Sequence, residues 1–159
     1  GAAGSFLGTL LERITAALSA KGGSREDHAR ALRRSFLVSA DMAHAAHPNY
    51  LDKHEPAHRP ELGGGVVIKT NVNQSYTTDA ESAARFMAFC REVGTPVQQF
   101  VTRSDLGCGS TIGPITAAQL GIPAIDVGNP MLSMHSAREM AAADDVAPLI
   151  RALGRFLVR

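Results

Sequence analysis

Apolar residues recur every three or four positions at both ends of the chain, a spacing typical of amphipathic helices. Near the start, the apolar positions are Phe6, Leu7, Leu10, Leu11, Ile14 and Leu18, and Gly22 and Gly23 follow them. A short polar helix is predicted next over residues 25–34, with Ser24 as its N-cap. The same spacing predicts a terminal helix over residues 147–158.

Between these helices, short apolar runs alternate with two further helical segments. The runs at residues 35–40, 65–69, 97–102 and 122–127 predict buried strands, and residues 79–91 and 111–120 predict helices. In the first of these two helices, Ala83, Ala84, Met87 and Ala88 are expected on the inner face. Strands that alternate with helices predict an α/β layered domain, with a largely parallel sheet flanked by helices and no internal boundary.

Composition narrows the function classes. The chain has 159 residues, 45% of them hydrophobic and 19% charged, a balance typical of one globular domain. A formal net charge of +1 gives no electrostatic case for a nucleic-acid partner, and no apolar run is long enough to span a membrane. Cys90 and Cys108 are too few for a disulfide framework, which favours a reducing, cytoplasmic location.

Polar side chains with possible chemistry fall at the ends of the predicted strands, where ligands bind in parallel sheets. Asp41 ends the first strand, Lys69 the second, Arg103–Asp105 the third, and Asp126 lies near the end of the fourth. A lysine at a strand tip suits a clamp for a carboxylate, and the alternative is a side chain that extends to solvent from the sheet edge.

The segment after Asp41 carries His44 and His47, an arrangement that suits a metal or proton-transfer site. If residues 42–46 form a helical turn, the two histidines share a face. The alternative is that Asp41 caps a helix and the histidines are surface residues. A second histidine site, His135, is by itself more often structural than a ligand.

A glycine-rich turn over residues 105–114 precedes the predicted helix at 111–120 and can offer backbone N–H groups to an anion. It lacks the lysine and hydroxyl residue that end a nucleotide-binding P-loop. Within it, Cys108 is either a nucleophile or, more commonly for cysteine, a small buried apolar residue.

Taken together, these motifs resemble the M18 aspartyl aminopeptidase family. The resemblance rests on runs in the family's order and spacing across nearly the whole chain: residues 35–44, 47–55 and 58–60, Val67–Lys69 with Asn71 and Tyr76, residues 108–114, Met134–Ser136, and Arg138–Met140. It implies a metal-dependent enzyme that releases N-terminal Asp or Glu from peptides, with two divalent metal ions, most often zinc, with cobalt or manganese as alternatives.

The resemblance also implies roles for single residues. Asp41 and His135 match metal ligands, one for each ion. Asp41, His44, Lys69 and Tyr76 match positions that contact substrate, Lys69 being the cation that meets the acidic side chain. His47 lies on the same loop and is a weaker candidate. The residues of the turn at 108–114 are expected to line the site with backbone groups.

The family's other metal ligands, its general base and its dimerisation domain have no counterpart in residues 1–159. The resemblance therefore implies the C-terminal portion of a catalytic domain, inactive alone and part of a homo-oligomer, by resemblance a dodecamer. Two alternatives remain: a non-catalytic fragment or interaction chain, and a related two-metal aminopeptidase of neutral specificity, against which Lys69 argues.

Overall fold

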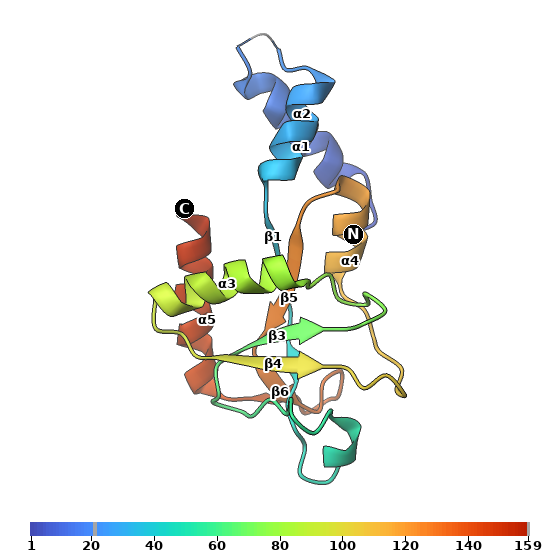
Figure 1. Cartoon of the computed structure of the whole chain (residues 1–159), viewed down its shortest axis with the longest axis vertical. Coiled ribbons are helices and arrows are strands. Elements are labelled where there is room, and N and C mark those ends of the chain that lie inside the picture. The colour runs from blue at the N-terminus through green and yellow to red at the C-terminus, as the bar shows by residue number, and fades with distance from the viewer. Residues whose placement is uncertain (21, 159) are drawn as a thin grey trace.

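A computed structural model describes residues 1–20 and 22–158 of the chain (Figure 1). The helices are α1 (Phe6–Leu18), α2 (Arg25–Arg34), α3 (Ala80–Glu92), α4 (Ile112–Leu120) and α5 (Val146–Leu157), with 3₁₀ turns η1 (Leu51–Lys53) and η2 (Ala143–Asp145). The strands are β1 (Leu37–Ala40), β2 (Ala43–His44), β3 (Val66–Thr70), β4 (Val97–Val101), β5 (Ala124–Gly128), β6 (Pro130–Leu132) and β7 (Met140–Ala141). Each helix and strand predicted from the pattern is present within two residues of its expected bounds.

The main sheet has the strand order β1-β5-β3-β4. β1 runs parallel to β5 and β3 runs parallel to β4, so the predicted parallel character is confirmed for these two pairs. The two pairs meet at an antiparallel junction between β3 and β5, which the sequence pattern did not indicate. A smaller sheet, β2-β6-β7, lies in segments for which the sequence pattern predicts no strand.

One face of the main sheet forms the principal core. Val66, Ile68, Ile125 and Val127 alternate along β3 and β5 and pack against α3 and α5. From α3, the side chains that pack there are Phe86, Phe89 and Cys90. The expected inner face of this helix was therefore only partly right: Ala83 and Met87 pack against the core, but Ala84 is exposed. The larger aromatic residues occupy the core because they bury more apolar area.

Helix α4 lies against β1 and β5, and its first turn approaches the sheet closely. Thr111 is its N-cap and accepts a hydrogen bond from the Gly113 N–H, and Gly121 ends it in a left-handed conformation. A β-carbon at Gly113 would lie 2.6 Å from the Asp126 carboxylate, so only glycine permits this approach. The polar face of the sheet is thus partly covered by the start of α4.

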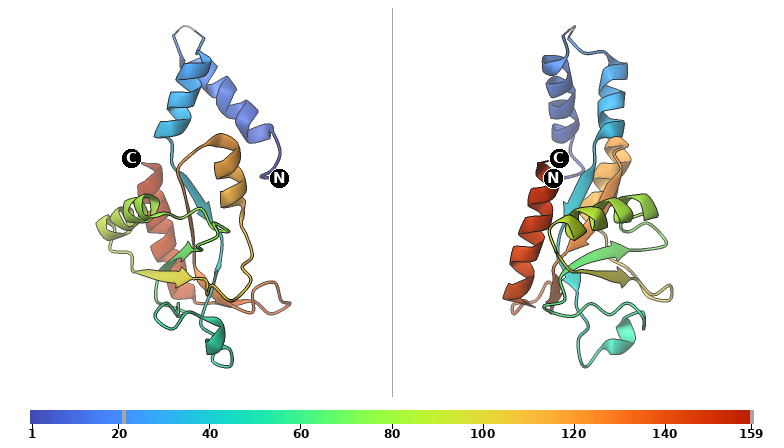
Figure 2. Two further views of the ribbon diagram at one scale, coloured as in Figure 1. Left: turned by 45° about the vertical axis from the view of Figure 1, so that its right-hand side comes forward. Right: turned by 60° about the vertical axis from the view of Figure 1, so that its left-hand side comes forward.

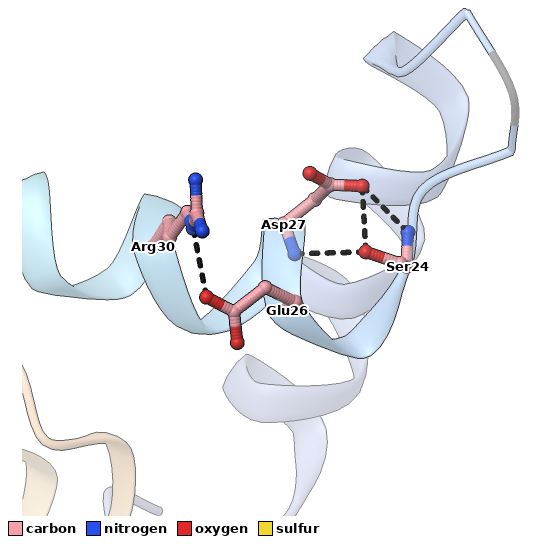
Figure 3. A network of polar contacts seen from close by, with 4 residues as sticks. All are labelled: Ser24, Glu26, Asp27 and Arg30. Carbon is pink, nitrogen blue, oxygen red and sulfur yellow. Dashed lines mark hydrogen bonds and ion pairs between the residues drawn. The ribbon is translucent and has the colours of Figure 1, made fainter.

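Helices α1 and α2 form a hairpin that projects from the body of the domain (Figures 1 and 2). The predicted N-cap of α2 is confirmed, because Ser24 and Asp27 each bond the other's backbone in a capping box (Figure 3). Glu26 pairs with Arg30 one turn further on. Side chains along the apolar stripe of α1 stay exposed, Leu18 at 83%, so the hairpin presents apolar surface.

Two glycines provide a test of the packing around β5. A β-carbon at Gly128 would overlap the carbonyl oxygen of Asp41, whereas one at Gly154 in α5 would meet no atom. We expect Gly128→Ala to lower the free energy of unfolding by about 2–3 kcal/mol through overpacking. We expect Gly154→Ala, the matched control, to raise it by about 0.5–1 kcal/mol, because alanine favours the helix. Urea unfolding of the 159-residue chain measures both; equal effects would contradict the close approach at Gly128.

Candidate functional site

Of the six residues named as metal or substrate contacts by the family resemblance, five line one cavity of about 160 Å³: Asp41, His44, Lys69, Tyr76 and His135. They come from five different segments of the chain. The remaining wall contains Met42, Phe100, Thr102, Met134 and the turn at residues 107–111. His47 does not line this cavity but a larger neighbouring one. The predicted site residues thus converge, with His47 set apart.

The antiparallel junction changes how these residues meet. Because β3 and β5 run in opposite directions, the carboxyl ends of the strands do not share one edge. Lys69 is paired in register with Phe100, and Ser39 with Asp126. These residues alternate with the core residues of their strands and so point to the opposite face from α3 and α5. The cavity therefore lies over this face rather than at a shared strand edge as expected.

Asp41 directly follows β1, as predicted, and its side chain is exposed at the cavity. Its carboxylate accepts a hydrogen bond of 2.7 Å from the Met42 N–H. Residues 42–46 do not form a helical turn, because Ala43 and His44 form β2 and pair with β6. Asp41 is therefore not a helix cap, and its carboxylate is available to a ligand.

Lys69 is buried, with a relative exposure of 1%. Its ammonium donates a hydrogen bond of 3.1 Å to the carbonyl oxygen of Met42 and lies 5.2 Å from the centre of the Tyr76 ring. Burial lowers the pKa of Lys69, and the nearby carboxylates of Asp41 and Asp126 oppose this. The alternative of an edge lysine that extends to solvent is wrong.

Asp126 is fully buried in the middle of β5, not near its end. Its carboxylate accepts hydrogen bonds from the N–H and hydroxyl of Thr77, at 2.7 and 2.9 Å, and from the hydroxyl of Thr111, at 2.6 Å. Its backbone N–H donates to the Thr78 hydroxyl. These bonds fix the segment before α3 and the start of α4 against the sheet.

Tyr76, shortly before α3, and Cys108, shortly before α4, both line the cavity. Burial raises the pKa of Tyr76 well above its usual range, and the neighbouring Cys108 and carboxylates add to this. The phenol is therefore protonated at neutral pH and can donate a hydrogen bond. The sulfur of Cys108 is half-buried and accepts a hydrogen bond from the Thr102 hydroxyl.

The segment that carries His135 has an unusual backbone. Ser133 and His135 both have positive φ angles, 58° and 65°, on either side of Met134. The N–H of His135 donates to the Glu139 carboxylate at 2.6 Å, which holds the turn. Such conformations cost free energy and are found where a site needs a particular geometry. The turn brings both Met134 and His135 to the cavity wall.

His44 shares the cavity wall with His135, Lys69 and Asp41. Burial lowers its pKa, and the neighbouring His135 and Lys69 lower it further, while Asp41 raises it. The imidazole is therefore neutral at neutral pH. A neutral imidazole can accept a hydrogen bond or donate one from its other nitrogen.

The donor set fits part of a metal centre. A carboxylate and an imidazole are ligands that zinc and similar ions accept, and Asp41 and His135 present one of each to the same cavity. Among residues 1–20 and 22–158, no three His, Cys, Asp or Glu side chains are placed to hold a metal ion together.

Phe100, Thr102 and Met134 line the cavity but were not identified as candidates from the sequence. Phe100 lies in β4 and Thr102 just beyond it, so their position at a strand end was the available signal. Met134 owes its place to the backbone turn at Ser133 and His135, which hydrophobic patterning does not indicate.

The fold matches solved M18 aminopeptidase structures. Yeast aminopeptidase 1 superposes with a TM-score of 0.85 and 29% identity over 99% of this chain and 34% of that one. The Thermotoga maritima M18 aminopeptidase gives a TM-score of 0.80 and 28% identity over 98% and 35%. A chain in the structure of an Ape4 and Nbr1 complex gives 0.92 and 43% identity over 98% and 29%.

Sequence comparison leads to the same group. The family model "Aminopeptidase I zinc metalloprotease (M18)" matches residues 1–157, and the chain belongs to this family. It is 52% identical over 156 residues to a probable M18 family aminopeptidase 2 from Stutzerimonas stutzeri, covering 98% of this chain and 35% of the relative. The corresponding Mycobacterium bovis protein is 52% identical over 157 residues, covering 99% and 36%. The chain thus spans about a third of the length of these relatives.

No helix in the described residues could cross a membrane.

His54 gives the fold a testable pH dependence. It is only 6% exposed, and its ring packs edge-on to Phe100 at 5.8 Å. Burial lowers its pKa, so the unfolded chain binds a proton more readily than the folded one. The contribution of His54 to the free energy of unfolding is therefore fully present above the ordinary histidine pKa of about 6.5. This contribution is lost as the pH falls below that value.

We expect His54→Phe to flatten the dependence of unfolding free energy on pH between neutral and mildly acidic conditions. The measurement is urea unfolding of the 159-residue chain at a series of pH values. His28→Phe, at a histidine of the α1–α2 hairpin, is the control and should leave the slope as in the wild type. An unchanged slope in His54→Phe would show that the buried imidazole is not the source.

Proposed function

We propose that the longer protein represented by this chain is a metal-dependent aminopeptidase that releases N-terminal Asp and Glu from peptides. The observation that carries the proposal is the convergence of Asp41, His44, Lys69, Tyr76 and His135 on one cavity. A buried ammonium beside two candidate metal ligands suits a substrate with an acidic side chain next to its scissile bond. We propose residues 1–159 as the C-terminal portion of the catalytic domain.

In this proposal Asp41 and His135 each contribute one ligand to a pair of divalent ions, zinc by family membership. The ions, when bound, polarise the scissile carbonyl and lower the pKa of a bound water. The general base and the remaining ligands belong to the part of the protein outside this chain. The chain alone is accordingly inactive in this proposal.

The other residues hold the substrate. The ammonium of Lys69 donates a hydrogen bond to the Met42 carbonyl oxygen. From this position it can also pair with the acidic side chain of the substrate. The protonated phenol of Tyr76 and the neutral imidazole of His44 can hydrogen-bond carboxylate or carbonyl oxygens. The carboxylate of Asp41 attracts the free α-ammonium that distinguishes an N-terminus. His47 has a more distant role, because it lines the neighbouring cavity.

We propose that the enzyme is a homo-oligomer. A solved structure of the related yeast mApe1 is a dodecamer, and apolar side chains are exposed along α1 and α5 of this chain. Such surface is usually covered by further protein. A cytoplasmic location is supported by Cys90 and Cys108, both of which are free thiols.

The metal role of Asp41 is tested by Asp41→Asn in the full-length protein. An amide lacks the charge of the carboxylate, so we expect loss of bound metal and at least a 100-fold drop in kcat, on the order found when a catalytic group is removed. Metal content is measured by atomic emission after dialysis, and turnover with an Asp dipeptide. Asp144→Asn, at an exposed aspartate in η2, is the matched control. Wild-type metal content and turnover in Asp41→Asn would remove Asp41 from the site.

The specificity role of Lys69 is tested by Lys69→Met, which keeps the length of the side chain and removes its charge. A charge-assisted hydrogen bond is worth about 1.5–3 kcal/mol, so we expect kcat/KM for an Asp substrate to fall roughly 10- to 100-fold. The loss for a Leu substrate should be much smaller. Arg151→Met, at an exposed cation on α5, should change neither. An unaltered Asp-to-Leu ratio in Lys69→Met would argue for the neutral-specificity alternative.

A further inference from the structure

A second and larger cavity, of about 550 Å³, adjoins the candidate site. The two cavities share five wall residues: His44, Phe100, Thr102, Gly107 and Met134. The second cavity is otherwise lined by Ala45, His47, Tyr50, Lys53, His54, Leu106, Met131, Leu132 and Ser133. It is therefore continuous with the site that contains Lys69 and the candidate metal ligands.

The wall of the second cavity is mainly apolar and aromatic. Leu106 and Leu132 are half-buried there, and Tyr50 stacks at a tilt on His47 at 5.0 Å. His54 is packed against Phe100 and is kept neutral by burial. Lys53 is the one lysine or arginine among the wall residues, and its side chain is 60% exposed and pairs with Asp52. A cavity with this lining favours apolar rather than charged groups.

Phe100 and Met134 stand at the junction of the two cavities. Met134 is held there by the left-handed residues on both sides of it, and Phe100 by its place in β4. An extended peptide advances about 3.3–3.6 Å per residue. The two cavities share a wall, so a peptide with its first side chain beside Lys69 has its second residue within one residue's advance of that wall.

We propose that the second cavity is the subsite for the side chain that follows the scissile bond, and that it selects apolar second residues. The inference rests on the proposed function, because it places the first residue in the cavity that contains Lys69. Leu106, Leu132 and Tyr50 are the specificity-determining side chains. It also gives His47 a role: its ring forms part of this wall and does not meet the acidic first residue.

The experiment uses the full-length protein with a series of dipeptides, Asp-Phe, Asp-Leu, Asp-Gly and Asp-Asp, and with Asp amide, which has no second side chain. We expect kcat/KM for Asp-Phe to exceed that for Asp-Asp by roughly 10-fold or more, as hydrophobic pockets achieve for one side chain. Leu106→Ser should lower the Asp-Phe to Asp-amide ratio several-fold. Tyr50→Ala should do the same, and because Tyr50 is exposed its removal leaves the core intact.

Leu62→Ser is the matched control, at a half-buried loop leucine that lines neither cavity, and should keep the wild-type ratios. Calorimetric binding of an uncleavable reduced-bond Asp-Phe to metal-depleted protein gives a readout independent of turnover, and both cavity variants should weaken it. Cleavage of all four dipeptides at equal rates would overturn the subsite while leaving the proposed function in place. Cleavage of Leu dipeptides but of no Asp substrate would overturn both.

Discussion

The buried carboxylate of Asp126 is the interaction on which the candidate site depends. It accepts bonds from Thr77 and Thr111, two residues 34 positions apart in the sequence, and so ties two segments to the middle of β5. One segment carries Tyr76, and the other completes the turn that contains Cys108. A buried charge is stable only when its hydrogen-bonding capacity is met. Removing one donor would therefore disturb the cavity wall as well as the fold.

The antiparallel junction between β3 and β5 explains the form of the site. It places Lys69 beside Asp126, whose charge opposes the desolvation of the ammonium. Lys69 and Asp126 point to the face opposite α3 and α5, where they share the sheet with the apolar Val67 and Phe100 of a second, smaller buried cluster. This second face forms the walls of the two adjoining cavities. The site is thus a property of one sheet face, supplemented by loops.

Local pattern predicted the helices and the main strands because each has a clear period, a cap or a breaking glycine, as at Ser24 and Gly121. Family resemblance, rather than pattern, brought Asp41, Lys69, Tyr76 and His135 together as candidates. The direction of β3 against β5 could not be predicted, since strand direction depends on long-range pairing. The short strands β2, β6 and β7 were missed for a different reason, because a strand of two or three residues has no period. The burial of Lys69 and Asp126 follows from the long-range pairing of β3 with β5.

The cavity draws on residues from Asp41 to His135, and this span has a consequence for folding kinetics. The α1–α2 hairpin is local and needs only neighbouring residues, so it can form early. The cavity requires the closure of a long loop, because β1 pairs with β5 more than 80 residues later, as Leu37 with Ala124. During synthesis, Asp41 and Lys69 therefore acquire their final contacts only after β5 has been synthesised.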